Sequence, residues 1–411
     1  MRLLEKIHSK TARIAVIGMG YIGIPTAVCV AEAGYTVHGV DIKENVINSL
    51  NNGNFGAKEP QLVEALEKNI KKGRIKVSLS YEKSDIFIIC VPTPLKEKRA
   101  DLSHVENAGK SIAAILEEEN LIILESTVPP GTTNELLIPL LERSGLQNDK
   151  DFFVSFCPER VLPGKIMQEM RKNDRITGGS AESREIAAEF YGSFVKGEIC
   201  LTDLKTAEIV KLMENTFRNV NIALANELGL ACESLGINFF EARKLANKHP
   251  RVNIHKAGTG VGGHCIPIDP WFIHEKLPLK TISTAMEIND TMPLHVADII
   301  KKTNAKKILI FGMAYKKNTD DTRETPVLKI TEELKKENIE FSIYDPYVKM
   351  EKLKPENCDA LLIATDHDCF KNIDWEEIRR KMRRPLIIDG RNFFEREEAE
   401  KMGFEYIGVG K

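Results

Sequence analysis

The sequence lacks several features that would assign it to a specialised class of protein. It contains no run of about eighteen apolar residues, so we expect no transmembrane helix and no membrane partner. The N-terminal residues have no apolar core of the kind that signal peptides carry. The formal net charge of the 411 residues is only −2, which gives no reason to expect nucleic acid as a partner.

Paired cysteines are also missing. The eight cysteines are scattered, with no CxxC pair, and several lie inside apolar runs. We therefore expect neither a disulfide framework nor a metal site, and a reducing, cytoplasmic location. The remaining composition, 42% hydrophobic and 29% charged, is that of an ordinary globular protein, and the length suggests two or three domains.

A glycine-rich turn follows the first apolar run. Residues 13–17 predict a strand, residues 18–23 read Gly-Met-Gly-Tyr-Ile-Gly, and residues 24–32 predict a helix. A second strand, 36–40, ends at Asp41. This order is typical of a dinucleotide-binding unit, in which Gly18 and Gly20 admit the turn and the pyrophosphate, while Gly23 lets helix and strand pack. Asp41 would accept hydrogen bonds from ribose and repel a 2′-phosphate, which favours NAD over NADP. A glycine-rich turn without a ligand is the alternative.

Further predicted strands alternate with helices. Residues 85–91, 121–125 and 152–157 read as strands, and polar side chains follow each of them: Thr93, Thr127 and Glu159. Ligands of open α/β sheets bind at the carboxyl ends of strands, so these three residues are candidate site residues. Thr127 stands before two prolines and could instead cap a loop.

A long helix is predicted over residues 206–235. Lys211, Asn215 and Arg218 are spaced so that they share one face, although such a polar row is often only solvated. Another face of this helix is apolar and consists of Ile209, Val210, Leu212, Met213, Phe217, Val220 and Leu224. Helices are also predicted over 239–246 and 284–302.

Between these helices lies Gly260-Val-Gly-Gly-His-Cys265-Ile-Pro-Ile-Asp269-Pro270. The glycines let the backbone come close to a bulky group, and the prolines stiffen the exit. A thiol on such a loop is a candidate nucleophile, and a buried, inert cysteine is the alternative.

From residue 306 the β/α alternation returns without a GxGxxG turn. Strands are predicted over 307–311, 341–344, 360–364 and 386–388, with a helix over 327–336. This half either takes a different ligand or is purely structural. We therefore expect an α/β protein with two Rossmann-like, doubly wound domains (1–203 and 303–411) joined by a central helical domain (204–302) that contains a long helix.

Six motifs occur together and in order: GMGYIG, VPTP, STVPPGT, the Lys211–Asn215 helix, GGHCIPIDP and Tyr-Lys…Asp-Asp-Thr-Arg. Together they resemble the UDP-glucose/GDP-mannose dehydrogenase family of nucleotide-sugar 6-dehydrogenases over nearly the whole chain. The resemblance implies an N-terminal NAD domain, a central dimerisation domain and a C-terminal domain for the nucleotide-sugar.

Two segments indicate which sugar the nucleotide-sugar substrate would carry. Residues 157–164 read CPERVLPG where UDP-glucose enzymes of the family usually read NPEFLREG, so Glu159 is kept and Pro163 replaces the second glutamate. This segment resembles the branch that acts on UDP-N-acetylhexosamines, and residues 268–273 favour UDP-N-acetyl-D-mannosamine. UDP-N-acetylglucosamine and UDP-glucose remain alternatives.

The resemblance implies a four-electron oxidation of the sugar at C6, with two NAD reduced. Cys265 would attack the aldehyde to give a thiohemiacetal and then a thioester, which water cleaves. Lys211 is the expected source of the positive charge that favours the thiolate, and with Asn215 it would donate to the developing alkoxide. Asp269, Glu159 and Thr127 are candidates for orienting water and taking protons, in roles that stay open.

The remaining contacts also follow from the resemblance. Arg251 would reach the neighbouring subunit's site, which requires a homodimer, and further pairing of dimers is left open. Arg323 has an alternative role in an ion pair with Asp320 or Asp321. The implied NAD contacts are Tyr21, Ile22, Asp41, Thr93, Thr127 and Arg323. The implied substrate contacts are Arg160, Val161, Lys211, Asn215, Arg218, His249, Arg251, Gly262, Tyr315 and Lys316.

Two other functions compete with this interpretation. A β-hydroxyacid dehydrogenase also joins a Rossmann domain to helices and uses a helix lysine, but it needs no thiol and performs one oxidation. A non-catalytic NAD-binding regulator would leave Cys265, Lys211 and Asn215 without a purpose.

Overall fold

The computed structural model describes residues 2–53, 59–161, 164–350 and 352–411. Leu162 and Pro163, which belong to the first of the two segments that indicate the sugar, lie outside these residues. The chain divides into two compact units, one of residues 1–213 and 271–277 and the other of residues 214–270 and 278–411. We call them unit 1 and unit 2.

Unit 1 contains an eight-stranded sheet in the order β10-β9-β8-β7-β4-β1-β2-β3. The six strands from β8 to β3 are parallel and follow the order of a dinucleotide-binding Rossmann sheet. The sequence did not predict β3, β9 or β10, and β9 runs antiparallel to β8. The strands are β1 (Arg13–Ile17), β2 (Thr36–Val40), β3 (Ile75–Ser78), β4 (Ile86–Ile89), β7 (Leu121–Leu124), β8 (Phe153–Phe156), β9 (Arg175–Gly178) and β10 (Ile199–Thr202).

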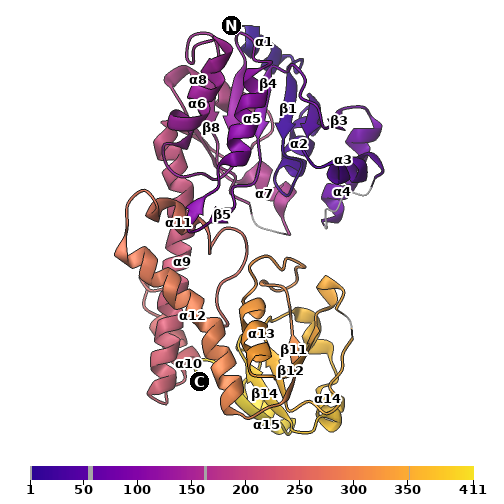
Figure 1. Cartoon of the computed structure of the whole chain (residues 1–411), viewed down its shortest axis with the longest axis vertical. Coiled ribbons are helices and arrows are strands. Elements are labelled where there is room, and N and C mark those ends of the chain that lie inside the picture. The colour runs from indigo at the N-terminus through magenta and orange to yellow at the C-terminus, as the bar shows by residue number, and fades with distance from the viewer. Residues whose placement is uncertain (1, 54–58, 162–163, 351) are drawn as a thin grey trace. The chain divides into compact units, whose positions relative to one another are not determined.

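Helices cover both faces of this sheet (Figure 1). They are α1 (Arg2–His8), α2 (Gly23–Glu32), α3 (Glu44–Asn51), α4 (Pro60–Lys71), α5 (Ser103–Ala113), α6 (Ile138–Leu141), α7 (Ile166–Lys172) and α8 (Ala181–Gly192). The short elements are the hairpin β5 (Leu95–Lys96) and β6 (Arg99–Ala100), the π-helical turn η1 (Thr133–Leu137) and the 3-10 turn η2 (Glu142–Ser144).

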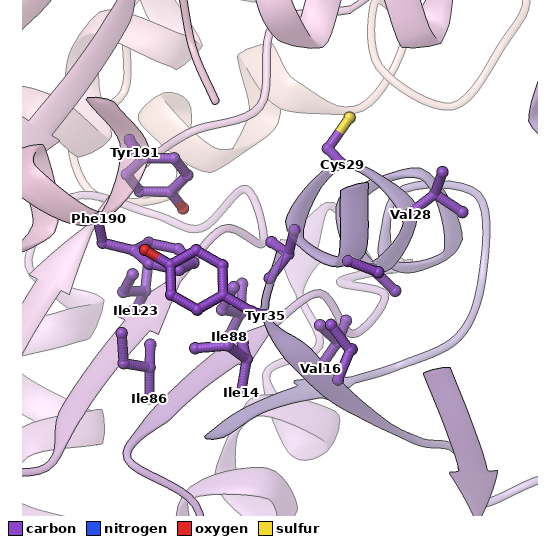
Figure 2. Close-up of a cluster of buried hydrophobic side chains, with 14 of the residues drawn as sticks. Ile14, Val16, Val28, Cys29, Tyr35, Ile86, Ile88, Ile123, Phe190 and Tyr191 are labelled. Carbon is purple, nitrogen blue, oxygen red and sulfur yellow. The ribbon is translucent and has the colours of Figure 1, made fainter. Parts of the chain in front are cut away.

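Alternate residues of the strands build two hydrophobic cores. Ile14 and Val16 of β1 pack with α2, α4, α7 and α8, and Tyr35 and Phe190 belong to the same cluster (Figure 2). Ala15 and Ile17 face the other way and pack with residues of α5 and α6. Because side chains alternate along a strand, a strand that is buried on both faces reads as a continuous apolar run, as the sequence shows here.

Four helices follow in the chain: α9 (Leu204–Ser234), α10 (Phe239–Ala246), α11 (Asp269–His274) and α12 (Lys280–Lys302). The first, second and fourth confirm the helices predicted over 206–235, 239–246 and 284–302. The apolar face predicted for α9 is divided, because Leu212 is fully buried whereas Met213 and Phe217 are 58% and 67% exposed.

Unit 2 contains a five-stranded parallel sheet in the order β12-β11-β13-β14-β15. Its strands are β11 (Lys307–Phe311), β12 (Glu340–Tyr344), β13 (Ala360–Ile363), β14 (Leu386–Asp389) and β15 (Glu405–Gly408). Residues of α12 and α13 (Pro326–Lys336) pack on one face, and residues of α14 (Trp375–Lys381) and α15 (Arg396–Lys401) pack on the other. The turns are η3 (Pro346–Val348) and η4 (Asp368–Asn372). This strand order is the other common doubly wound arrangement.

The predicted fold class is confirmed: two Rossmann-like parallel sheets and a central helical region with a long helix (Figure 1). Within the described residues, no helix is both long enough and apolar enough to span a membrane.

Candidate functional site

The loop between β1 and α2 has the geometry that a dinucleotide needs. Gly18 has a φ of +93°, and a Cβ on Gly23 would lie 1.8 Å from the carbonyl oxygen of Gly18, so the turn admits only glycine at both positions. A Cβ on Gly20 would meet nothing within 4 Å, which leaves this backbone open to a ligand. The loop therefore fits a pyrophosphate at the N-terminus of α2.

Asp41 is held beside this loop. Its Oδ2 accepts a hydrogen bond of 2.9 Å from the backbone N–H of Met19, and its Oδ1 accepts one of 2.9 Å from that of Lys43. Tyr21 is exposed and Ile22 is half-buried at the start of α2. All three positions are compatible with the NAD contacts expected from the sequence.

The ends of β4 and β7 bring two predicted site threonines together. These strands pair with each other, and Oγ1 of Thr93 donates to the carbonyl oxygen of Thr127 at 2.7 Å. The turn beyond Thr127 is fixed by Glu208 of α9, which accepts from the backbone N–H groups of Gly131 at 2.5 Å and Thr133 at 2.8 Å. Thr127 therefore leads into a firmly held turn.

Glu159 lies in a buried charge cluster. Nη2 of Arg175 donates to Oε2 of Glu159 at 2.5 Å, and Nη1 donates to Oε1 of Glu125 at 3.1 Å. The hydroxyl of Tyr191 donates to the same oxygen of Glu125 at 2.6 Å. The side chains of Arg175, Glu125 and Glu159 are 5%, 0% and 8% exposed, so one guanidinium bridges two carboxylates away from water.

Burial raises the pKa of Glu159 above its ordinary value, and the negative charge of Glu125 raises it further. Arg175 and, to a smaller extent, Lys211 act in the opposite direction. Lys211 is thus an electrostatic neighbour of Glu159 in unit 1. A carboxyl group with a raised pKa exchanges its proton closer to neutral pH, which suits the predicted role of Glu159.

Lys211 and Asn215 occupy successive turns of α9, about 6 Å apart along the axis. Asn215 is 6% exposed, and its Nδ2 donates to Oδ2 of Asp269 at 2.5 Å. Asp269 is itself 3% exposed. The structure therefore joins two predicted catalytic residues, and the amide of Asn215 keeps a second hydrogen for another acceptor.

Cys265 is exposed, which excludes the alternative of a buried, inert thiol. Its carbonyl oxygen accepts from the backbone N–H of Asp269 at 2.8 Å, so the thiol stands at the start of the turn that leads into α11. Two of the preceding glycines lie close to the bulky side chain of Tyr315. Gly263 has a φ of +91°, and a Cβ on Gly262 would lie 2.6 Å from Cβ of Tyr315.

Arg323 contacts the cysteine loop through its backbone, because its carbonyl oxygen accepts from the N–H of Gly263 at 2.9 Å. Its guanidinium donates to both carboxylate oxygens of Asp321, at 2.9 and 2.6 Å, so the ion pair that the sequence left as an alternative is formed. The pKa of Arg323 is raised, chiefly by its hydrogen bond to Asp321 and to a smaller extent by Cys265. Arg323 is therefore a cation within electrostatic reach of the thiol.

Among the predicted substrate contacts, Gly262, Tyr315 and Arg218 gather in unit 2. Burial is the largest cause that raises the pKa of Tyr315, and the charge of Arg218 lowers it. Lys316 follows Tyr315 and is half-buried. Of these residues, Tyr315 lies directly against Gly262 and Gly263, which precede Cys265.

The other predicted substrate contacts lie elsewhere in the two units. Arg251 is exposed, and its backbone N–H donates to Nδ1 of His249 at 3.3 Å. In unit 1, Nη1 of Arg160 donates to the carbonyl oxygen of Asp174 at 3.1 Å, and Val161 packs against the hydrophobic core.

The second sheet does not repeat the ribose site of the first. Asp345 follows β12 as Asp41 follows β2, and its Oδ2 likewise accepts from the backbone N–H of a residue that follows a glycine, here Met313 at 2.7 Å. It differs from Asp41 in that the same oxygen also accepts from the N–H of Ala314 at 2.9 Å. Nε2 of His367 lies 3.1 Å from the same oxygen, and both side chains are 0% exposed. A ligand of unit 2 must therefore be held by other groups.

Arg391 is a candidate for that role which the sequence reasoning missed. It lies two residues after β14, its side chain is 29% exposed, and it pairs with Asp366 at 3.3 Å. A Cβ on Gly258 would lie 3.2 Å from Nη1 of Arg391, so this cation borders the chain that leads to Cys265. Applying the strand-end rule to the predicted strand 386–388 would have found it.

Comparisons with known proteins identify the family of the chain. Residues 12–195, 205–291 and 309–396 match the NAD binding domain, the central domain and the UDP binding domain of the UDP-glucose/GDP-mannose dehydrogenase family. The UDP-N-acetyl-D-mannosamine dehydrogenase of Methanocaldococcus jannaschii is 48% identical over 97% of this chain and 96% of that protein.

Solved structures give the same result. The UDP-D-ManNAc dehydrogenase of Pyrococcus horikoshii superposes with a TM-score of 0.91 at 44% identity, covering 97% of this chain and 99% of that one. The UDP-N-acetyl-mannosamine dehydrogenase of Staphylococcus aureus gives a TM-score of 0.89 at 40% identity, covering 97% and 98%. NAD is thus the cofactor, and a UDP-binding domain is present. The chain belongs to the UDP-glucose/GDP-mannose dehydrogenase family, whose members are nucleotide-sugar dehydrogenases.

Proposed function

We propose that this protein is a UDP-N-acetyl-D-mannosamine 6-dehydrogenase that oxidises C6 of the sugar to a carboxylate. The observation that carries the chemistry is the exposed thiol of Cys265, four residues before the buried Asp269 that Asn215 holds. The choice of sugar is supported by the names of the relatives above and by Cys157-Pro158-Glu159-Arg160-Val161.

The reaction proceeds in four steps. The C6 alcohol first loses a hydride and a proton and becomes an aldehyde. The thiolate of Cys265 adds to the aldehyde carbon, forming a C–S bond and a thiohemiacetal. Loss of a second hydride gives a thioester, and water then breaks the C–S bond and restores the thiol. In sum, one alcohol, two NAD⁺ and one water give one carboxylate, two NADH and three protons.

NAD supplies the hydride acceptor for both oxidations. Lys211 and Asn215 donate hydrogen bonds to the C6 oxygen when it carries negative charge, which is worth about 3–4 kcal/mol for one such donor in other enzymes. Asp269, Glu159 and Thr127 orient water and take protons. The buried Arg175 favours the ionised form of Glu159 for this work.

Binding is divided among three domains, which we place at residues 1–203, 204–302 and 303–411. Tyr21, Ile22, Asp41, Thr93, Thr127 and Arg323 contact NAD. The UDP-sugar is bound by Arg160, Val161, Lys211, Asn215, Arg218, His249, Arg251, Gly262, Tyr315 and Lys316. The cations in this set suit a diphosphate.

The protein acts as a homodimer in the cytoplasm, with Arg251 completing the partner's site. Support comes from α9 and the residue that follows it, because Met213, Phe217, Leu224 and Leu228 of the helix and Leu235 after it are exposed by 36–72%. At 3.6 residues per turn these side chains fall within about 60° of one another around α9 and its C-terminal extension, and they span about 33 Å. Such an apolar stripe is what a second copy of the helix would cover.

The test is an NADH assay with purified protein against UDP-N-acetyl-D-mannosamine, UDP-N-acetylglucosamine, UDP-glucose and GDP-mannose. We expect turnover with the first sugar. Activity confined to UDP-glucose would overturn the choice of sugar. One NADH per sugar would favour the single-oxidation dehydrogenase, and binding of NAD without turnover of any sugar would favour a regulator.

Variants test the mechanism and the dimer. Cys265→Ala should lose turnover but bind NAD, whereas Cys200→Ala, which removes another exposed thiol, should behave as the unmodified enzyme. Inactive Arg251→Ala and Cys265→Ala subunits should regain activity when mixed, because a mixed dimer contains one intact site. Absence of recovery, with subunit exchange shown, would exclude action of Arg251 in the partner's site.

A further inference from the structure

Helix α9 buries a row of asparagines on the side opposite its exposed apolar stripe. Asn215, Asn219 and Asn226 fall within about 40° of one another around the axis, at 3.6 residues per turn. Asn219 and Asn226 are each 1% exposed, and Asn289 of α12 is 4% exposed. A buried helix face is normally apolar, and buried amides need hydrogen-bond partners. These side chains therefore call for a specific explanation.

Two of the asparagines hold the segment that carries the thiol. Nδ2 of Asn219 donates to the carbonyl oxygen of Ile266 at 3.0 Å, directly after Cys265. Oδ1 of Asn226 accepts from the backbone N–H of Gly258 at 3.0 Å. Both ends of the segment 258–266 are thus attached to one helix.

Asn289 links these two attachments. Nδ2 of Asn226 donates to Oδ1 of Asn289 at 2.9 Å, and Nδ2 of Asn289 donates to the backbone carbonyl oxygen of Asn219 at 3.1 Å. Between the attachments, a Cβ on Gly260 would lie 3.0 Å from Cδ of Pro293, so the segment also lies close to α12. One continuous row of hydrogen bonds joins the two ends.

The composition of the segment explains why amides are needed. Residues 258, 260, 262 and 263 are glycines, so there are few side chains to anchor by apolar packing. Glycine also loses the most conformational freedom on ordering. Hydrogen bonds to the backbone are the means that remain for holding such a segment in one conformation.

We propose that Asn219, Asn226 and Asn289 are positioning residues for the nucleophile. They hold the backbone of residues 258–266 so that the thiol of Cys265 keeps one position. None of them is assigned to substrate or cofactor, which separates them from Asn215. The consequence for turnover rests on the function proposed above, whereas the anchoring itself does not.

Hydrogen exchange of the free enzyme tests the anchoring. Asn226→Ala removes the acceptor of the Gly258 N–H and should raise its exchange rate. If the network acts as a unit, exchange of the Asp269 N–H, which donates to the carbonyl oxygen of Cys265, should also rise by about tenfold, as the loss of one buried hydrogen bond implies. Faster exchange confined to Gly258 would overturn the proposal.

Turnover provides the second readout. Asn219→Ala and Asn289→Ala should lower kcat by about tenfold while KM changes less than about twofold, because the thiol acts after the substrate is bound. The matched control is Asn221→Ala on the same helix, whose half-buried side chain donates to the carbonyl oxygen of Phe217 at 2.7 Å and not to the segment 258–266. Equal losses in Asn221→Ala and Asn219→Ala would contradict the proposal.

The isosteric variant Asn219→Asp separates positioning from folding. Its carboxyl group can donate to the carbonyl oxygen of Ile266 only when protonated, so kcat of the folded fraction should recover as the pH falls, relative to the unmodified enzyme. Melting temperatures measured at each pH give the folded fraction. A kcat that follows the folded fraction alone would refute positioning. If the unmodified protein makes no NADH with any sugar, the proposed function fails, and the exchange result still decides the anchoring.

Discussion

Replacement of Arg175 by Met tests how unit 1 tolerates its buried charges. The change removes the guanidinium that bridges Glu125 and Glu159 and leaves two carboxylates that are 0% and 8% exposed. Methionine is apolar and nearly as long, so the cavity left behind is small. The main effect is therefore electrostatic.

The magnitude follows from the bonds lost. Arg175 makes one charge-assisted hydrogen bond to each carboxylate, at 3.1 and 2.5 Å. Such bonds contribute about 1.5–3 kcal/mol each, and breaking a buried ion pair from one side costs about 3–5 kcal/mol. We expect the free energy of unfolding of unit 1 to fall by about 3–5 kcal/mol.

The chain contains two tryptophans, Trp271 in unit 1 and Trp375 in unit 2. In a Trp375→Phe background, the fluorescence of Trp271 therefore reports urea unfolding of unit 1 alone. The control is Arg171→Met, which breaks the exposed pair with Glu32 and should cost less than about 1 kcal/mol.

The pH dependence of the Arg175→Met variant has a definite sign. Arg175 lowers the pKa of Glu159, so its removal raises that pKa further above the unfolded value. The variant should therefore approach the stability of the unmodified protein as the pH falls and should lose stability as the pH rises through the raised pKa. Adding Glu125→Gln removes one orphaned charge and should restore part of the loss. A cost below about 1 kcal/mol, or no rescue by Glu125→Gln, would refute the reasoning.

Three further predictions follow from the same structure. Glu125→Gln removes a charge that raises the pKa of Glu159, so the acid limb of the kcat–pH profile should move to lower pH. An unchanged limb would show that ionisation of Glu159 does not determine it. Gly263→Ala places a Cβ 2.8 Å from the ring of Tyr315 at a φ of +91°, so the kinetics of alkylation of the nearby thiol by iodoacetamide should change, whereas NAD affinity should not. Phe217→Glu puts a charge into the exposed stripe of α9 and should yield monomers in light scattering; an unchanged dimer would place the interface elsewhere.

Elements with a strong local signal could be predicted from the sequence. The glycine turn, the strands at 13–17, 36–40 and 307–311 and the long helix follow from periodicity and turn residues, and the structure places them within a few residues of the prediction. The carboxyl-end rule selected Thr93 and Thr127 as candidates, and in the structure Oγ1 of Thr93 donates to the carbonyl oxygen of Thr127. The sequence did not predict β9 and β10, because Arg175–Gly178 and Ile199–Thr202 mix polar and apolar residues at the end of the sheet.

Contacts between residues that are far apart in the sequence could not be predicted. Arg175 is separated from Glu125 by 50 positions, and nothing local to either residue shows that they meet. Asn219 and Asn226 looked like ordinary polar residues of a helix, because their partners come from a glycine segment and from α12. The sequence likewise could not predict that part of the apolar face of α9 is exposed, since periodicity alone does not show which face of a helix is covered.

The most direct test of the account is the number of NADH formed for each UDP-N-acetyl-D-mannosamine consumed. The assay combines absorbance at the NADH band with quantification of the sugar product by mass spectrometry, under limiting substrate. The account predicts two NADH and a C6 carboxylate. One NADH with an aldehyde product would contradict the thioester chemistry assigned to Cys265.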